Sequence, residues 1–207
     1  MHIGVAAYVA RWAASPFADI SDPPWQVTQQ AEVHVVKALS KLPGGYDLAN
    51  GVAIHQTAII EPGAIIKGPA MIGPRCFVAA GAYLRGGVFM DEDCIVGPGA
   101  ELKTTFMFKG SKLAHLNFVG DSVLGAGVNL EAGSIIANYR NELDDKTIRI
   151  RFENEVIDTG VEKFGVLAGD GTRVGANAVI APGAIFAKNA RVGRLSLIDQ
   201  YPFVDER

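Results

Sequence analysis

The chain has 207 residues, of which 49% are hydrophobic and 20% charged, and its formal net charge is −3. This length and composition fit one globular domain with a short appendage and exclude a disordered chain. The weak negative charge provides no basic patch for nucleic acid or an anionic membrane, so we expect neither partner. No apolar run approaches the roughly 18–20 residues that cross a bilayer, so the mean hydropathy of +0.20 indicates a large core and an oligomer interface.

Residues 1–50 precede the repeat described next and are expected to form an N-terminal helical cap. The apolar start at residues 3–10 is short and lacks a basic flank, so we do not expect a signal peptide. Asp22-Pro23-Pro24 has the pattern of a helix start, and apolar residues then follow helical spacing to Leu42. This predicts a helix of about five turns that packs on the coil or on a neighbouring subunit and covers the coil's open end. We expect no function for His34.

Residues 51–199 carry a repeat with a period of six. Large aliphatic side chains recur at one position, and small side chains recur two residues before it. The aliphatic column begins with Ile54, Ile60, Ile66, Ile72, Val78, Leu84, Met90, Val96 and Leu102. Neither a helix nor an amphipathic strand has this period. It predicts a mainly β fold, a left-handed parallel β-helix in which three hexapeptides form one triangular turn and successive turns stack about 4.8 Å apart.

The two cysteines, Cys76 and Cys94, occupy the small column one turn apart, so we expect them to stack in adjacent turns. They are interpreted as small buried hydrophobic residues, with a redox role as the alternative. Two cysteines are too few for a secreted disulfide scaffold or a zinc ribbon, which favours a cytoplasmic protein with reduced thiols. The four histidines do not have the spacing of a three-ligand metal site, so no metal is predicted.

The repeat changes register after Leu102 and resumes with an aliphatic column that starts at Phe118. His115 lies in the intervening segment. Departures from a regular pattern are expected at functional sites, which makes His115 a candidate for chemistry.

Residues 140–162 interrupt the repeat a second time. The stretch 147–152 alternates polar and apolar residues, and Glu153-Asn154 can turn the chain back. This pattern predicts a β-hairpin inserted at a corner of the coil, where such loops often line sites. The coil then resumes near Val174, and residues 200–207 are expected to form a C-terminal tail.

Several blocks of the sequence resemble a known family of hexapeptide-repeat acyltransferases. Glu101 to Lys103, Gly110 to Asp121, Val128 to Ser134 and Ile136 to Tyr139 are similar to the acetyltransferase domain of bifunctional N-acetylglucosamine-1-phosphate uridylyltransferases. Asn138 to Pro182 is closer to the C-terminal domain of archaeal sugar-1-phosphate nucleotidylyltransferases. The resemblance covers roughly residues 52–193. No glycine-rich nucleotide loop is found, so we do not expect uridylyl transfer.

The resemblance implies an acetyl-CoA-dependent N-acetyltransferase that acts on an amino-sugar phosphate. His115 matches the catalytic base that takes a proton from the sugar amine. An imidazole suits this task because it exchanges protons near neutral pH. Backbone N–H groups around Ala132 match the oxyanion-stabilising position. Glu101 is a candidate for orienting His115.

The acceptor side of the resemblance involves five residues. Arg85 and Lys103 match basic residues that hold the sugar phosphate, while Asn129, Tyr139 and Lys163 match further contacts of the sugar and its phosphate. The repeat adds an independent point, because Arg85 and Lys103 are 18 residues apart and therefore stand on one face in neighbouring turns. Two stacked cations can bind one anion together.

The cofactor side matches less completely. Asn138 matches a residue near acetyl-CoA, but Ala176 stands where the family has a CoA-contacting serine. The family's basic tail is missing, and Arg194 with Arg191 can take its place. Phe118 replaces a tyrosine on the substrate side, so one phosphate hydrogen bond is lost. These departures leave the acceptor open, and it can be a different amino sugar or a nucleotide-linked amino sugar.

Alternatives remain for both the residues and the function. Arg85 and Lys103 can be solvated surface residues, Asn129 a corner asparagine, and Tyr139 an anchor for the hairpin. O-acyl transfer would use the same base. A different class of function is a non-catalytic β-helix subunit that assembles with or regulates a separate nucleotidylyltransferase. Relatives with this fold are trimers with sites between subunits, so we expect a homotrimer.

Overall fold

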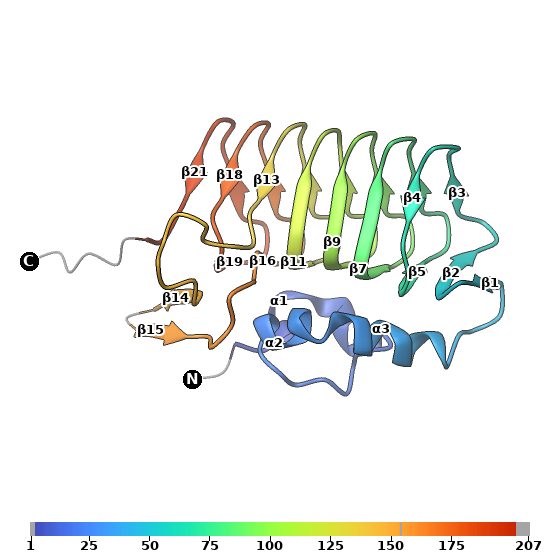
Figure 1. Cartoon of the computed structure of the whole chain (residues 1–207), viewed down its shortest axis with the longest axis horizontal. Coiled ribbons are helices and arrows are strands. Elements are labelled where there is room, and N and C mark those ends of the chain that lie inside the picture. The colour runs from blue at the N-terminus through green and yellow to red at the C-terminus, as the bar shows by residue number, and fades with distance from the viewer. Residues whose placement is uncertain (1–2, 154, 202–207) are drawn as a thin grey trace, which may run out of the picture.

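The protein is a parallel β-helix, as the repeat predicts. The computed structural model describes residues 3–153 and 155–201, and its coil makes about eight turns. Figure 1 shows the turns stacked along the long axis, from β1 (Tyr46–Ala49) at one end to β21 (Leu197–Ile198) at the other. Residues 1–2, Asn154 and 202–207, which belong to the expected cap, hairpin turn and tail, lie outside the described residues.

Each turn has three short faces, and each face is a stack of parallel strands. The first face is a seven-stranded sheet of β3 (Ile59–Ile60), β6 (Phe77–Val78), β8 (Ile95–Val96), β10 (Lys112–Leu113), β12 (Asn129–Leu130), β17 (Arg173–Val174) and β20 (Arg191–Val192). The second face consists of β4 (Ile65–Ile66), the starts of β7 (Tyr83–Met90), β9 (Glu101–Met107) and β11 (Phe118–Leu124), and then β13 (Ile135–Ile136), β18 (Val179–Ile180) and β21. The third face consists of β2 (Val52–His55), β5 (Ala70–Ile72), the ends of β7, β9 and β11, β16 (Val166–Ala168) and β19 (Ala184–Phe186).

The aliphatic and small columns of the repeat fill the interior of the prism. Every member of the aliphatic column from Ile72 to Leu102 is completely buried. Cys76 and Cys94 are buried free thiols one turn apart. Hydrogen bonding with Cys76 and burial raise the pKa of Cys94. Both residues pack in the core as small buried side chains, and the raised pKa keeps the Cys94 thiol uncharged.

The register slip lies at the corner between the second and third faces. In β7 this corner holds Gly86 and Gly87, whereas β9 and β11 turn it with one left-handed residue each, Thr104 (φ 53°) and Asp121 (φ 45°). The turns that contain these residues are therefore one residue shorter. The slip was expected beside His115, and that placement is wrong, because the corner at His115 keeps its full length.

The N-terminal segment contains α1 (Val5–Tyr8), the 3₁₀ helix η1 (Ala10–Ala14), α2 (Pro24–Gln29) and α3 (Ala31–Leu39). The expected single helix of five turns is divided at Gln30, whose backbone (φ −103°, ψ 16°) is not helical. The helices lie along the third face and not over the end of the coil, so the prediction of an end cap is wrong (Figure 1).

The outward side chains of the third face explain where the helices pack. They are large and apolar, unlike those of an exposed face: Met71, Phe89, Phe106, Val123 and Leu167. Phe17 of the N-terminal segment contacts both Phe89 and Phe106 with ring centroids 4.9 Å apart and the rings nearly perpendicular. The third face is thus buried on both sides, and its strands have a second core between them and the helices.

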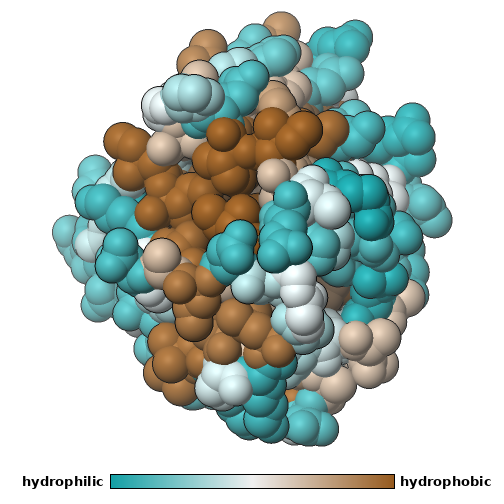
Figure 2. Space-filling view, turned by 90° about the vertical axis from the view of Figure 1, so that its right-hand side faces the viewer, coloured by the Kyte–Doolittle hydropathy of each residue, from teal (hydrophilic) through white to brown (hydrophobic). Residues whose placement is uncertain are grey.

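The beginning of the coil remains open. Leu48, Ile59 and Ile65 of the first turn and its hairpin are more than half exposed. Figure 2 looks at this end and shows hydrophobic side chains gathered across it. β1 pairs antiparallel with β2 and therefore covers one strand edge of the third face only.

The second interruption is the predicted hairpin. β14 (Arg149–Phe152) pairs antiparallel with β15 (Glu155–Asp158), and Arg149 lies opposite Asp158. Arg140 fixes the base of the insertion to the last turn, because its buried guanidinium lies 2.6 Å from Asp199.

Candidate active site

Arg85 and Lys103 form a column on the second face. Arg85 pairs in register with Lys103, and Lys103 pairs with Gly120, in three successive turns. Leu84 and Leu102, the residues before the two cations, are buried, so the cations point outward. The stacking that the 18-residue spacing predicts is therefore present, at the edge of the second face next to the third.

Each of these cations has a carboxylate partner. Arg85 Nη2 lies 2.6 Å from Glu101 Oε1, and Lys103 Nζ lies 2.8 Å from Asp121 Oδ2. The side chains of Lys103 and Asp121 are only 18% and 7% exposed, so this pair is largely shielded. Within the described residues no hydrogen bond links Glu101 to His115, so the structure does not support Glu101 as the orienting residue. Arg85 keeps donors that Glu101 does not use and can still offer them to a phosphate.

Asp121 organises the polar contacts at this corner, and sequence reasoning missed it. Its carboxylate accepts hydrogen bonds from Lys103 Nζ and Asn138 Nδ2. Gly120 leaves space for the Asn138 side chain because glycine has no Cβ. A Cβ at this position would clash with Asn138 Nδ2, only 2.6 Å away. The signal in the sequence was an aspartate within the shortened turn, since aspartate tolerates left-handed backbone better than most residues.

His115 lies at the corner between the first and second faces, with its side chain exposed. Its carbonyl accepts a hydrogen bond from Gly133 N–H (2.9 Å), which places Ala132 one turn further along. The Ala132 carbonyl in turn accepts from Asn177 N–H (3.0 Å), which places Ala176 in the next turn. His115, Ala132 and Ala176 therefore stack in three successive turns at one open corner.

Asn129 and Arg194 lie on the first face, around a hollow of about 310 Å³ that Glu131 and Arg173 also line. Arg194 donates two hydrogen bonds of 2.9 Å to Glu131. The Arg194 guanidinium and the Ala176 N–H lower the pKa of Glu131. The predicted sugar contact Asn129 is thus grouped with two of the three predicted cofactor residues, Arg194 and Ala176. The third, Asn138, lies at the opposite edge of the second face, bonded to Asp121.

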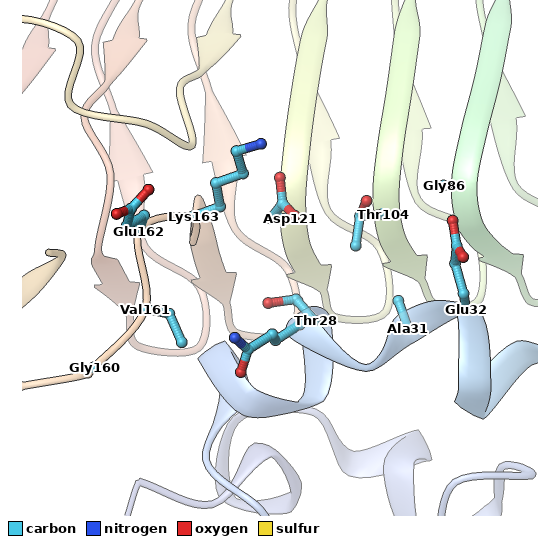
Figure 3. A pocket seen from close by; sticks show the side chains of 11 residues that line it. Thr28, Ala31, Glu32, Gly86, Thr104, Asp121, Gly160, Val161, Glu162 and Lys163 are labelled. Carbon is cyan, nitrogen blue, oxygen red and sulfur yellow. The ribbon is translucent and has the colours of Figure 1, made fainter. Parts of the chain in front are cut away.

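A larger cavity of about 430 Å³ lies at the corner between the second and third faces (Figure 3). It brings Lys163 next to Asp121, and through Asp121 next to Lys103 and Asn138. Its lining comes from α2 and α3, from the corner residues of β7, β9 and β11, and from the segment after the hairpin: Thr28, Gln29, Ala31, Glu32, Gly86, Thr104, Asp121, Gly160, Val161, Glu162 and Lys163.

Tyr139 and Phe118 have different surroundings. Lys146 Nζ lies over the Tyr139 ring, 5.6 Å from its centroid, so this tyrosine contacts the inserted segment, as an anchor would. Phe118 is half-buried on the second face, where it pairs in register with Glu101 and Ile135. The predicted site residues are thus found in three places: at each of the two edges of the second face, and on the first face.

Comparisons with known proteins identify relatives of the chain. "Bifunctional protein GlmU" of Methanococcus maripaludis is 37% identical over 182 residues, which are 85% of this chain and 43% of that protein. A "Bifunctional sugar-1-phosphate nucleotidylyltransferase/acetyltransferase" of Sulfurisphaera tokodaii is 38% identical over 92 residues, which are 44% of this chain and 22% of that protein. The chain is a homologue of GlmU-type proteins. It spans less than half the length of these curated relatives.

The remaining comparisons give weaker similarities or none. A hexapeptide transferase family protein from Anaplasma phagocytophilum aligns with a TM-score of 0.41 and 17% identity, over 70% of this chain and 72% of that one. No family model matches the chain. Among the described residues, no group of three or more histidine, cysteine, aspartate or glutamate side chains is placed to hold a metal. No helix in that part of the chain is long and apolar enough to cross a membrane.

Proposed function

We propose that the chain is a CoA-dependent N-acyltransferase that transfers an acetyl group to the amine of a sugar. The observation that carries this proposal is the stack of His115, Ala132 and Ala176 at one open corner, beside a face that bears Arg85 and Lys103. The relatives support it, because one of them is described as an acetyltransferase.

The chemistry requires a base next to the acceptor amine. The amine nitrogen attacks the thioester carbonyl carbon, a C–N bond forms, and the C–S bond breaks. His115 takes the proton that the nitrogen loses and returns it to the departing thiolate. Backbone N–H groups near Ala132 stabilise the negative charge that develops on the carbonyl oxygen. The exposure of His115 leaves its ring open to both substrates.

Acyl-CoA is expected to bind along the first face and at the corner between the first and second faces. Arg173 and Arg194 line the hollow there and supply cations for the phosphates of CoA. Arg194 is shared with Glu131, so we expect Arg173 to be the stronger contact. Asn129, at the same hollow, becomes a contact of the cofactor or of a sugar that a second chain presents.

A homotrimer is part of this proposal. The helices cover the third face, which leaves the first and second faces of the coil free along its length to meet other copies. Leu116 and Leu195 project at the corner between these two faces and are 70% and 79% exposed, although leucine at a left-handed corner position is otherwise unfavourable. Val179 and Leu197 add exposed apolar surface on the second face. Burying these side chains between copies would close the site around His115.

The test is acetyl-CoA turnover with a panel of amino sugars, measured as free CoA. His115→Ala is expected to lower kcat about 100- to 10,000-fold while acetyl-CoA still binds by calorimetry. His55→Asn, in β2 at the beginning of the coil, is the matched control and should keep its activity. Unchanged turnover in His115→Ala would exclude His115 as the base.

The same assay separates the other candidates. Mass spectrometry of the product after mild alkali distinguishes an amide, which survives, from an ester, which is cleaved. A protein that binds no acetyl-CoA and instead co-purifies with a nucleotidylyltransferase would be the non-catalytic subunit.

A further inference from the structure

The 430 Å³ corner cavity lies at the opposite edge of the second face from His115. Asp121 lies six positions after His115, which corresponds to about 20 Å of extended chain at most. The column of Arg85 and Lys103 stands at the edge next to the cavity, because the residues that follow them, Gly86 and Thr104, line it. A sugar phosphate placed between His115 and this column would leave the cavity empty.

The N-terminal helices form a fixed wall of this cavity. The junction of α2 and α3 approaches the corner so closely that a Cβ on Gly87 would lie 2.7 Å from Glu32 N and 2.8 Å from Ala31 C. Gly87 also has a φ of 86°, which glycine adopts without strain. Figure 3 shows the Glu32 side chain directed toward Gly86 and the Lys163 amine directed toward Asp121.

The polar groups around the cavity differ in whether they have partners. Asp121 accepts hydrogen bonds from Lys103 and Asn138, both at Oδ2. In residues 3–153 and 155–201, by contrast, Gln29, Glu32, Glu162 and Lys163 are exposed, and their side chains make no hydrogen bond or ion pair, so they are free to contact a bound molecule. These four groups line one hollow from two separate segments of the chain.

The charges of these four side chains determine which kind of molecule the cavity can bind. Two carboxylates, Glu32 and Glu162, outweigh the one cation, Lys163, so the cavity disfavours a phosphate. Carboxylates and an amide accept hydrogen bonds from neighbouring hydroxyl groups, as acidic residues do with the hydroxyls of ribose in dinucleotide sites. The volume falls within the roughly 300–1,000 Å³ of small-molecule sites.

We propose that the acceptor is an amino sugar linked through a diphosphate to a nucleoside, and that the nucleoside occupies this cavity. The amine then lies at His115, the diphosphate lies along Arg85 and Lys103, and the ribose hydroxyls donate to Glu32. This assignment rests on the proposed acyl transfer, but the binding of the nucleoside part can be measured without it.

The kinetic test compares one amino sugar as its 1-phosphate and as its nucleoside-diphosphate derivative. The wild-type kcat/KM is expected to be at least tenfold higher for the nucleotide-linked form. Glu32→Gln should lower kcat/KM about tenfold for that form and less than twofold for the sugar phosphate, since a charged hydrogen-bond acceptor is replaced by a weaker neutral one. Gln29→Ala should act in the same direction. Glu155→Gln, on the hairpin outside the cavity, is the matched control and should change neither.

The binding test uses uridine, guanosine and thymidine diphosphates without acetyl-CoA, measured by calorimetry. At least one should bind saturably, and Glu32→Gln should weaken it about tenfold. If none binds and the sugar phosphate is as good an acceptor, the nucleotide assignment is wrong while acyl transfer stands. If a diphosphate binds through Glu32 but no acceptor is acetylated, the cavity assignment stands and the proposed acyl transfer fails.

Discussion

Replacing Asp121 with asparagine should destabilise the protein through Lys103. Asparagine keeps the shape of the side chain and also tolerates the left-handed backbone at this corner, so the substitution isolates the charge. At 2.8 Å and an effective dielectric constant of about 20, the gross attraction of the pair is about 6 kcal/mol, an upper bound on its value. Lys103 is 18% exposed and can recover part of its hydration. We therefore expect a net loss of about 3 kcal/mol, at the lower end for a broken buried pair.

The measurement is the midpoint of thermal unfolding, followed by circular dichroism at one fixed protein concentration because oligomerisation would shift it. A loss of about 3 kcal/mol in a chain of this length corresponds to a decrease of about 6–12 °C. The double variant Asp121→Asn/Lys103→Met leaves no unpaired ammonium, so it should recover about half of the lost stability.

Two results would refute this reasoning. One is a midpoint that falls by less than about 2 °C in Asp121→Asn. The other is a double variant no more stable than Asp121→Asn alone, which would show that the destabilisation does not come from an unpaired Lys103.

Three further predictions concern the packing and the last turn. Phe106→Ala should lower the free energy of unfolding by about 3–5 kcal/mol in denaturant titrations, because it empties the layer between helices and coil, whereas Phe77→Ala on the partly exposed first face should cost less. Gly87→Ala should detach α3 from the corner and speed its amide hydrogen exchange; unchanged exchange would contradict the close contact at Glu32. Burial raises the pKa of Asp199, but hydrogen bonds from Arg140 and backbone N–H groups outweigh it, so the pKa is lowered overall. Its stabilisation is complete above the ordinary aspartate value of about 3.9 and is lost as the pH falls through the lower folded value, so Asp199→Asn should flatten the acid limb of the stability curve.

The coil could be predicted because the six-residue pattern of aliphatic and small side chains recurs in its successive turns. The column from Ile54 to Leu102 determines which side chains point inward, and with it the stacking of Arg85 above Lys103. The position of the helices could not be predicted from their own pattern, because an apolar stripe is the same whether it packs on an end or a side. The docking position of the helices was indicated by the coil itself, where large apolar residues such as Phe89 and Phe106 point outward from the third face.

The site was predicted less completely than the fold. The similar blocks pointed to His115, Ala132 and Ala176, and the structure adds that these residues stack at one corner; their roles stay predictions. Asp121 and the two residues proposed to bind the nucleoside, Glu32 and Gln29, were missed because their grouping depends on which segments meet at a corner. Two of the three belong to helices whose docking site no local pattern specifies.

The inserted hairpin leaves the coil's alignment intact on every face. Ile135 pairs with Val179, Asn129 with Arg173 and Val123 with Leu167, each 44 residues apart, against 18 in the following turn, so 26 residues are added. All of them leave and return at one corner. Variation in length at that corner is therefore uncoupled from the core, which makes it a place where the binding properties of this scaffold can diverge, or be exchanged by grafting, without a new fold.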